Sequence, residues 1–114
     1  MKTYNFKEHH KGDTFKSPTF RLTINGVIQD IAEYEIRMQI RKDAAKTSPV
    51  MAEFNTKDET IERLTPTTDG EFKLKNRILD IPRGIYKYDV EFIKDEVVST
   101  WMKGIVPITE EVTQ

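Results

Sequence analysis

The 114-residue sequence contains no cysteine, which excludes disulfide bonds, thiolate metal sites and thiol catalysis together. It contains only two histidines, His9 and His10, and adjacent residues of a strand point to opposite faces. Both rings could therefore bind one metal ion only from a turn, and a zinc site built on three imidazoles is excluded within one chain. We expect no metal and no other cofactor, and a fold stabilised by packing alone.

Long hydrophobic runs are also missing. No apolar stretch approaches the roughly 20 residues that span a bilayer, and the polar start, residues 1–5, lacks the apolar segment of a signal peptide. The formal net charge is only -1, although 32% of the residues are charged. The chain thus lacks the field of one sign that nucleic-acid and membrane-surface binders need. We expect synthesis in a cytoplasm, with neither nucleic acid nor a membrane as partner.

A strict alternation of apolar and polar residues is what the sequence does contain. In 33–41 every even position is apolar and every odd one polar, and in 86–92 the same holds for Tyr86, Tyr88, Val90 and Phe92. Because successive side chains of a β-strand point to opposite faces, these segments predict strands with one packed and one solvated face. Weaker forms of the pattern predict further strands over 4–7, 19–24, 50–55, 60–64, 71–75 and 97–108.

About eight short strands in a chain of 13.3 kDa fit a single domain over 1–114. Antiparallel strands in this number close on each other or pack as two sheets, because one open sheet leaves an apolar face in water. We predict an all-β fold, an immunoglobulin-like antiparallel β-sandwich of about seven to eight strands. Tight turns are expected at 25–26, 68–70 and 94–96, a loop or single turn at 41–46, one helical turn at 76–81 and a frayed tail at 109–114.

The segment Ile81-Pro82-Arg83-Gly84-Ile85-Tyr86 has the spacing of a tyrosine corner. In immunoglobulin-like and fibronectin-like domains, a Tyr just after a crossover between sheets donates a hydrogen bond to the preceding backbone. Pro82, Gly84 and Tyr86 would form that structural corner here. A plain core tyrosine with its hydroxyl at the rim fits the pattern equally well.

Paired carboxylates are the nearest approach to a catalytic arrangement. Glu33 with Glu35, and Asp89 with Glu91, each place two acids about 7 Å apart on one strand face, a spacing that glycosidases use. Both pairs alternate with inward apolar residues and have basic neighbours, which favours a solvated face with cross-strand charge pairs. No serine lies in a nucleophile elbow, and phosphate-binding and calcium-binding loops are missing. We assign no catalytic residue and expect that the protein is not an enzyme.

Two segments are candidates for contact with another protein. Trp101 precedes Met102, and in a regular strand only one of two neighbours faces the core; if Met102 is inside, Trp101 is an exposed aromatic. The strand that includes Val50, Met51 and Phe54 carries little charge and is a poorly protected edge that can add to a neighbouring strand. The candidate partner contacts are therefore Trp101, Met102, Val50, Met51 and Phe54.

The layout of the whole chain suggests a family. A short N-terminal strand precedes Gly12-Asp13-Thr14-Phe15, and Met38-Gln39-Ile40-Arg41 and Gly84-x-Tyr86-x-Tyr88-Asp89 follow. With the end of the chain, this order resembles small virion-associated proteins of tailed bacteriophages and prophages. Those are immunoglobulin-like tail or baseplate accessory proteins, similar to the N-terminal domain of baseplate upper proteins. Where members usually have a Leu-Thr-Gly turn, this chain has 30–33.

The resemblance implies a non-enzymatic assembly module of the virion, in the tail, baseplate or a fibre. Such a module docks on other virion proteins through strand edges and loops, with a symmetric homo-oligomer as one arrangement. It would be made in the host bacterial cytoplasm and reside in the particle. The alternative from a different class is a carbohydrate- or ligand-binding β-sandwich, with Trp101 and loop tyrosines stacking on sugar rings.

Overall fold

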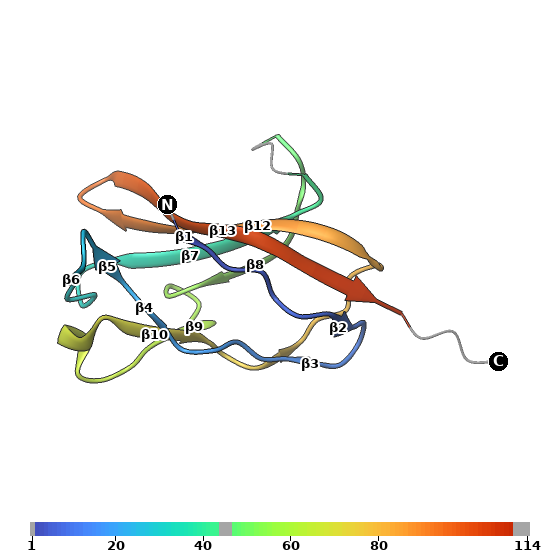
Figure 1. Ribbon diagram of the computed structural model, residues 1–114, viewed down its shortest axis with the longest axis horizontal. Helices are drawn as coiled ribbons and strands as arrows, with labels where there is room; N and C mark the ends of the chain where they lie inside the picture. Colours follow the sequence, from blue (N-terminus) through green and yellow to red (C-terminus); the bar gives the residue numbers. More distant parts are fainter. Residues whose placement is uncertain (1, 44–46, 111–114) are drawn as a thin grey trace.

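The computed structural model describes residues 2–43 and 47–110, which form two packed layers of β-strands. Figure 1 shows the larger layer above the smaller one, with the long axis along the strands of the larger layer. This larger sheet has the order β1-β13-β12-β7-β8, and β2 also pairs with β13. Its strands are β1 (Lys2–Thr3), β2 (His9–His10), β7 (Glu35–Arg41), β8 (Val50–Asn55), β12 (Gly84–Lys94) and β13 (Val97–Thr109).

The smaller layer is built from shorter pieces. Its main sheet has the order β4-β10-β9, and two strand pairs, β11-β3 and β5-β6, extend it. A single 3-10 turn, η1 (Thr67–Asp69), precedes β10. The strands of this layer are β3 (Thr14–Phe15), β4 (Phe20–Arg21), β5 (Thr23–Ile24), β6 (Val27–Ile28), β9 (Ile61–Arg63), β10 (Glu71–Leu74) and β11 (Arg77–Ile78).

This arrangement confirms the predicted all-β sandwich. The strand order β13-β12-β7-β8 against β4-β10-β9 corresponds to the two facing sheets of an immunoglobulin-like fold. Two details differ from the prediction. β1 and β2 run parallel to β13, so the larger sheet is not purely antiparallel. The helical turn expected at 76–81 is wrong, because β11 pairs there with β3.

The alternating residues fill one core between the layers. β7 has the burial pattern that its sequence predicts, with Ile36, Met38 and Ile40 fully buried and the odd positions partly exposed. Aromatic rings join the two sheets, since Phe72 of β10 lies 5.5 Å from Phe92 of β12 in an edge-to-face arrangement. Packing of this apolar face is what holds the sandwich together.

Turn chemistry also matches the sequence at several points. Asn25 and Gly26 have φ angles of 51° and 79°, the positive pair that a two-residue hairpin between β5 and β6 requires. Asp95 and Glu96, at 51° and 65°, make the equivalent turn between β12 and β13. The Tyr86 hydroxyl donates to the Pro82 carbonyl at 2.5 Å, which is the hydrogen bond of a tyrosine corner.

The N-terminal segment lies along β13 and is held by a close approach of two backbones. Tyr4 N–H donates to Lys103 O and Phe6 N–H donates to Ile105 O, each at 3.0 Å. Gly104, between these contacts, has no side chain, and the Tyr4 carbonyl takes that space. The Tyr88 ring lies beside Gly104, and its hydroxyl donates to the Tyr4 carbonyl. The strand expected over 4–7 is wrong in its bounds, because the regular strands here are β1 (Lys2–Thr3) and β2 (His9–His10), and 4–7 follows β13 through isolated hydrogen bonds.

Two segments that were expected to be irregular, 41–46 and 109–114, lie partly outside the described residues. Thr109 was expected to begin a frayed tail, but it ends β13, pairs with His10 and accepts a 2.7 Å hydrogen bond from Lys11 N–H. Glu110 is described, and 111–114 lie outside the described residues. In the loop expected at 41–46, Arg41 ends β7, and 44–46 also lie outside the described residues.

Candidate functional site

A β-bulge in β13 decides where Trp101 and Met102 lie. Val90 pairs with Met102 and the next residue, Glu91, pairs with Thr100, so Trp101 is an extra residue without a partner on β12. Both Met102 and Trp101 therefore turn toward the core side. Met102 is fully buried, and Trp101 is half-buried, with its ring 5.7 Å from Phe92.

The expectation that Trp101 is an exposed aromatic is thus wrong, and so is Met102 as a surface contact. The Trp101 ring also lies 6.0 Å from Phe72 of the opposite sheet, and its Nε1–H donates to the Thr23 carbonyl at 3.2 Å. The reasoning assumed a regular strand, in which neighbouring side chains take opposite faces. The bulge removes that condition at this one position.

The candidate contacts on β8, Val50, Met51 and Phe54, differ in how far their side chains are exposed. β8 is an edge strand, as expected, since β7 is its neighbour in the sheet order and no strand follows it among the described residues. Phe54 is fully buried, so it is a core residue rather than a contact. Met51 packs partly against the core, and Val50 is 43% exposed. Only Val50 of the three presents much of its side chain to a partner.

Side chains from the smaller layer cover part of the β8 edge. Arg77 of β11 donates from Nη1 to the Glu53 carbonyl at 2.9 Å and stacks its guanidinium over the Phe54 ring. Thr60 bonds both the N–H and the carbonyl of Asn55. Backbone groups that would otherwise pair with a new strand are thus occupied, which is how natural sheets limit strand addition at an edge.

Exposed aliphatic side chains gather instead at one end of the sandwich. The two hairpins β5-β6 and β12-β13 project at the same end of the molecule (Figure 1). Five of the eight exposed large hydrophobic residues among those described lie on them. We call this surface the hairpin end, and it consists of Ile24, Val27, Ile28, Val97 and Val98, which are 45–64% exposed.

A hollow of about 500 Å³ lies between the two hairpins. Trp101 and Phe92 form part of its lining, Ile24 and Asn25 come from the β5-β6 hairpin, and Lys2 places its ammonium 5.3 Å from the Trp101 ring centroid. The remaining lining residues are Leu22, Thr23, Tyr34, Ser99 and Thr100. The hairpin end therefore combines exposed apolar tips with an adjacent concave surface.

The outer face of the larger sheet is polar and connected across strands. Arg37 donates from Nη2 to Glu91 Oε1 at 2.9 Å, and Glu91 is only 6% exposed. Gln39 and Asn55 donate to the two carboxylate oxygens of Glu53 at 2.7 and 2.8 Å. Arg37 with Glu91 and Gln39 with Glu53 are the expected cross-strand pairs, although Glu91 is buried rather than solvated, and the Asn55 contact lies within β8.

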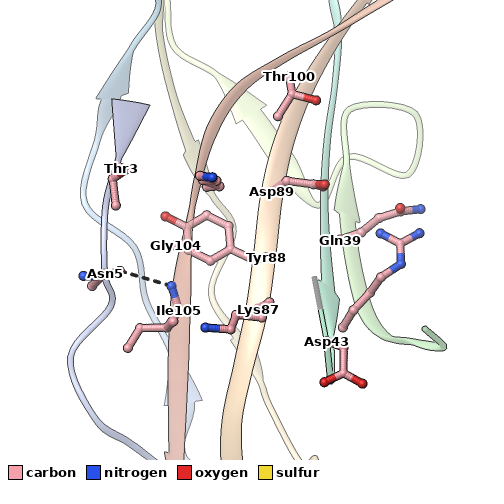
Figure 2. Close-up of a pocket in the computed structure, with 12 residues that line it drawn as sticks. Thr3, Asn5, Gln39, Asp43, Lys87, Tyr88, Asp89, Thr100, Gly104 and Ile105 are labelled. Carbon is pink, nitrogen blue, oxygen red and sulfur yellow. Dashed lines mark hydrogen bonds between the residues drawn. The ribbon is translucent and has the colours of Figure 1, made fainter. Parts of the chain in front are cut away.

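A second hollow, of about 510 Å³, lies on this outer face. Figure 2 shows Lys87, Asp89 and Thr100 on one side and Thr3 and Asn5 on the other, with Tyr88 and Gly104 between them. Asn5 Oδ1 accepts a 3.2 Å hydrogen bond from Ile105 N–H, which fixes the N-terminal segment at its rim. The remaining lining residues are Gln39, Arg41, Asp43 and Lys103.

Two buried tyrosines of β12, Tyr86 and Tyr88, have raised hydroxyl pKa values. Burial raises the pKa of the Tyr86 hydroxyl above its usual 10.0. Burial, and to a smaller extent the neighbouring Tyr4, raise the pKa of Tyr88 further. Both hydroxyls donate to backbone carbonyls, so both remain protonated donors well into the alkaline range.

Neither a metal centre nor a membrane-spanning helix is found in residues 2–43 and 47–110. No group of three or more His, Asp or Glu side chains there is placed to hold a metal ion. His9 lies in β2, with Nε2 3.1 Å from the Asp13 carbonyl and its ring against Phe15. None of the helical segments in this part of the chain is long and apolar enough to cross a membrane.

Comparison with models of known protein families gives no match, and a search among curated proteins gives none either. The geometry of the chain is therefore the basis for a functional assignment. The hairpin end was not among the expected contacts, although one signal for half of it was present. Ile24-Asn25-Gly26-Val27-Ile28 has a predicted two-residue turn with large aliphatic residues on both sides.

Proposed function

We propose that the protein is a non-enzymatic structural or assembly module of a tailed phage or prophage particle, which docks on other virion proteins through the hairpin end. The observation that carries this proposal is the concentration of Ile24, Val27, Ile28, Val97 and Val98 at one end of the sandwich. The resemblance to tail and baseplate accessory proteins is the reason for proposing that the module belongs to a phage particle. A β-sandwich is a suitable rigid scaffold for such a docking module.

The physical argument rests on apolar surface that the fold itself does not need. Contiguous exposed apolar patches of more than a few hundred Å² are rare on monomers and mark interaction surfaces. Val97 and Val98 are 64% and 51% exposed at the tip of the β12-β13 hairpin. Their exposure costs free energy in water, and a partner that covers them removes that cost.

The test is incorporation into particles. Mass spectrometry of purified particles from the encoding phage or induced prophage should detect the chain, and Val97→Asp with Val98→Asp should deplete it. Ile85→Asp is the matched control, because Ile85 is also 64% exposed but lies at the other end of β12, opposite Pro107. Absence of the wild-type chain from particles would refute the virion role, and equal depletion by Ile85→Asp would refute the hairpin end as the docking surface.

A ligand-binding sandwich, for example one that binds carbohydrate, is the second candidate, and the hollow on the outer face, with polar groups at several points of its lining, favours it. Lys87, Asp89 and Thr100 offer donors and acceptors around a concave surface of about 510 Å³, a suitable setting for a hydroxyl-rich ligand. Binding in a glycan array that is lost in a Lys87→Ala and Asp89→Ala double variant would support this candidate. Binding that survives the double variant would exclude the outer-face hollow as its site.

A further inference from the structure

The hairpin end has a projecting tip and, beside it, a hollow. The tip of the β12-β13 hairpin is a convex projection with Val97 and Val98 behind an acidic turn, Asp95-Glu96. The hollow beside it is concave, is lined by Trp101 and has the Lys2 ammonium over the indole ring. A projection and a recess of matching character on one surface are the requirement for a self-complementary, two-fold interface.

The charges of the two halves are opposite. Among residues 2–43 and 47–110, Asp95, Glu96 and Lys2 take part in no ion pair. The neighbouring Lys94 is already engaged, 3.5 Å from Glu33 and over the Tyr34 ring. An acidic tip entering the hollow of another molecule would therefore meet the Lys2 ammonium as a new partner.

We propose that the hairpin end binds a second copy of this chain, each copy placing its β12-β13 tip against the hollow of the other. This inference rests on the proposed function only in that it uses the same docking surface. The two-fold arrangement pairs Asp95 and Glu96 of each copy with Lys2 of the other, and buries Val97 beside Trp101. The exposed patch is small for a specific interface, so we expect a dissociation constant on the order of micromolar.

The test is the mass of the full chain in solution, measured by sedimentation equilibrium from about 1 to several hundred micromolar, a range set by that affinity. The wild-type chain should pass from monomer to dimer. The Lys2→Glu chain and the Asp95→Lys, Glu96→Lys chain should each dimerise about ten-fold more weakly, because like charges then face each other. An equimolar mixture of the two variants should recover wild-type affinity, since both contacts of the mixed dimer again pair opposite charges.

Circular dichroism melting of each variant checks that the fold is retained, and Ile85→Asp serves as a control that leaves dimerisation unchanged. A wild-type chain that stays monomeric throughout the range overturns the inference, as does a dimer that neither charge variant weakens. A monomer that nevertheless enters particles through the hairpin end leaves the docking function intact. If the chain forms a dimer with the expected charge dependence but is absent from particles, the dimer inference stands and the virion role is refuted.

Discussion

Gly104→Ala should be among the most damaging single substitutions in the chain. A Cβ added at Gly104 would lie 1.9 Å from the Tyr4 carbonyl oxygen, 2.8 Å from its carbonyl carbon and 2.9 Å from Cε1 of Tyr88. The nearest atoms belong to backbone, so no flexible side chain can move away to make room. The N-terminal segment would have to lift off β13.

The cost follows from the contacts that this movement breaks. Tyr4 N–H to Lys103 O, Phe6 N–H to Ile105 O and the Tyr88 hydroxyl to Tyr4 O are three hydrogen bonds, worth about 1 kcal/mol each. Phe6 is only 6% exposed, and partial exposure of its ring adds about 1–2 kcal/mol. The expected loss in the free energy of unfolding is therefore about 4–5 kcal/mol, a large fraction of the stability of a domain this size.

Urea denaturation followed by the fluorescence of Trp101 measures this loss, and hydrogen exchange at the Tyr4 and Phe6 amides locates it. Gly26→Ala is the control, because Gly26 has a φ of +79° but no atom within 4 Å of an added Cβ. That variant should lose only the cost of a left-handed alanine, about 1 kcal/mol. A Gly104→Ala protein within about 1 kcal/mol of the wild type would refute the reasoning.

Three further outcomes are expected. Tyr88 keeps its proton when folded to a higher pH than when unfolded, so the free energy of unfolding should fall above about pH 10 by up to about 1.4 kcal/mol per pH unit, and Tyr88→Phe should reduce that slope in pH-dependent urea titrations. Trp101→Ala should lower the stability by about 3–5 kcal/mol in calorimetry, since the ring packs between both sheets; a change under 1 kcal/mol would contradict that placement. Arg77→Ala should uncover the β8 edge and raise the aggregation rate measured by light scattering, whereas an unchanged rate would show that Arg77 does not protect it.

Much of the fold could be predicted because its signals are local. The alternation in β7 and the turn residues Asn25-Gly26 depend on nearest neighbours, and the core and the β5-β6 hairpin follow them. The position of Tyr86 in the corner also depends on a short spacing. These elements agree with the sequence pattern because no distant contact opposes it.

The candidate site was less predictable because it depends on contacts between distant segments. Nothing near Trp101 in the sequence signals the bulge, which is defined by the pairing of β13 with β12. Phe54 was taken for a contact because its strand carries little charge, yet the ring lies under Arg77, 23 residues later in the chain. The hairpin end, likewise, brings together Ile24 and Val97, which only the folded sandwich places at one end.

The bulge has a further consequence for the tip of the β12-β13 hairpin. From Met102 to Ile108 the even positions of β13 face inward. Between the hairpin turn and Trp101 the odd positions face that side, because Ser99 lies opposite Phe92. Deleting Trp101 would restore an unbroken ladder without turning the tip, because Thr100 already lies opposite Glu91 and Ser99 opposite Phe92. The extra residue therefore adds an indole ring between the sheets without changing which side of the tip Val97 occupies, and the loss of that one codon would remove the ring and leave the tip as it is.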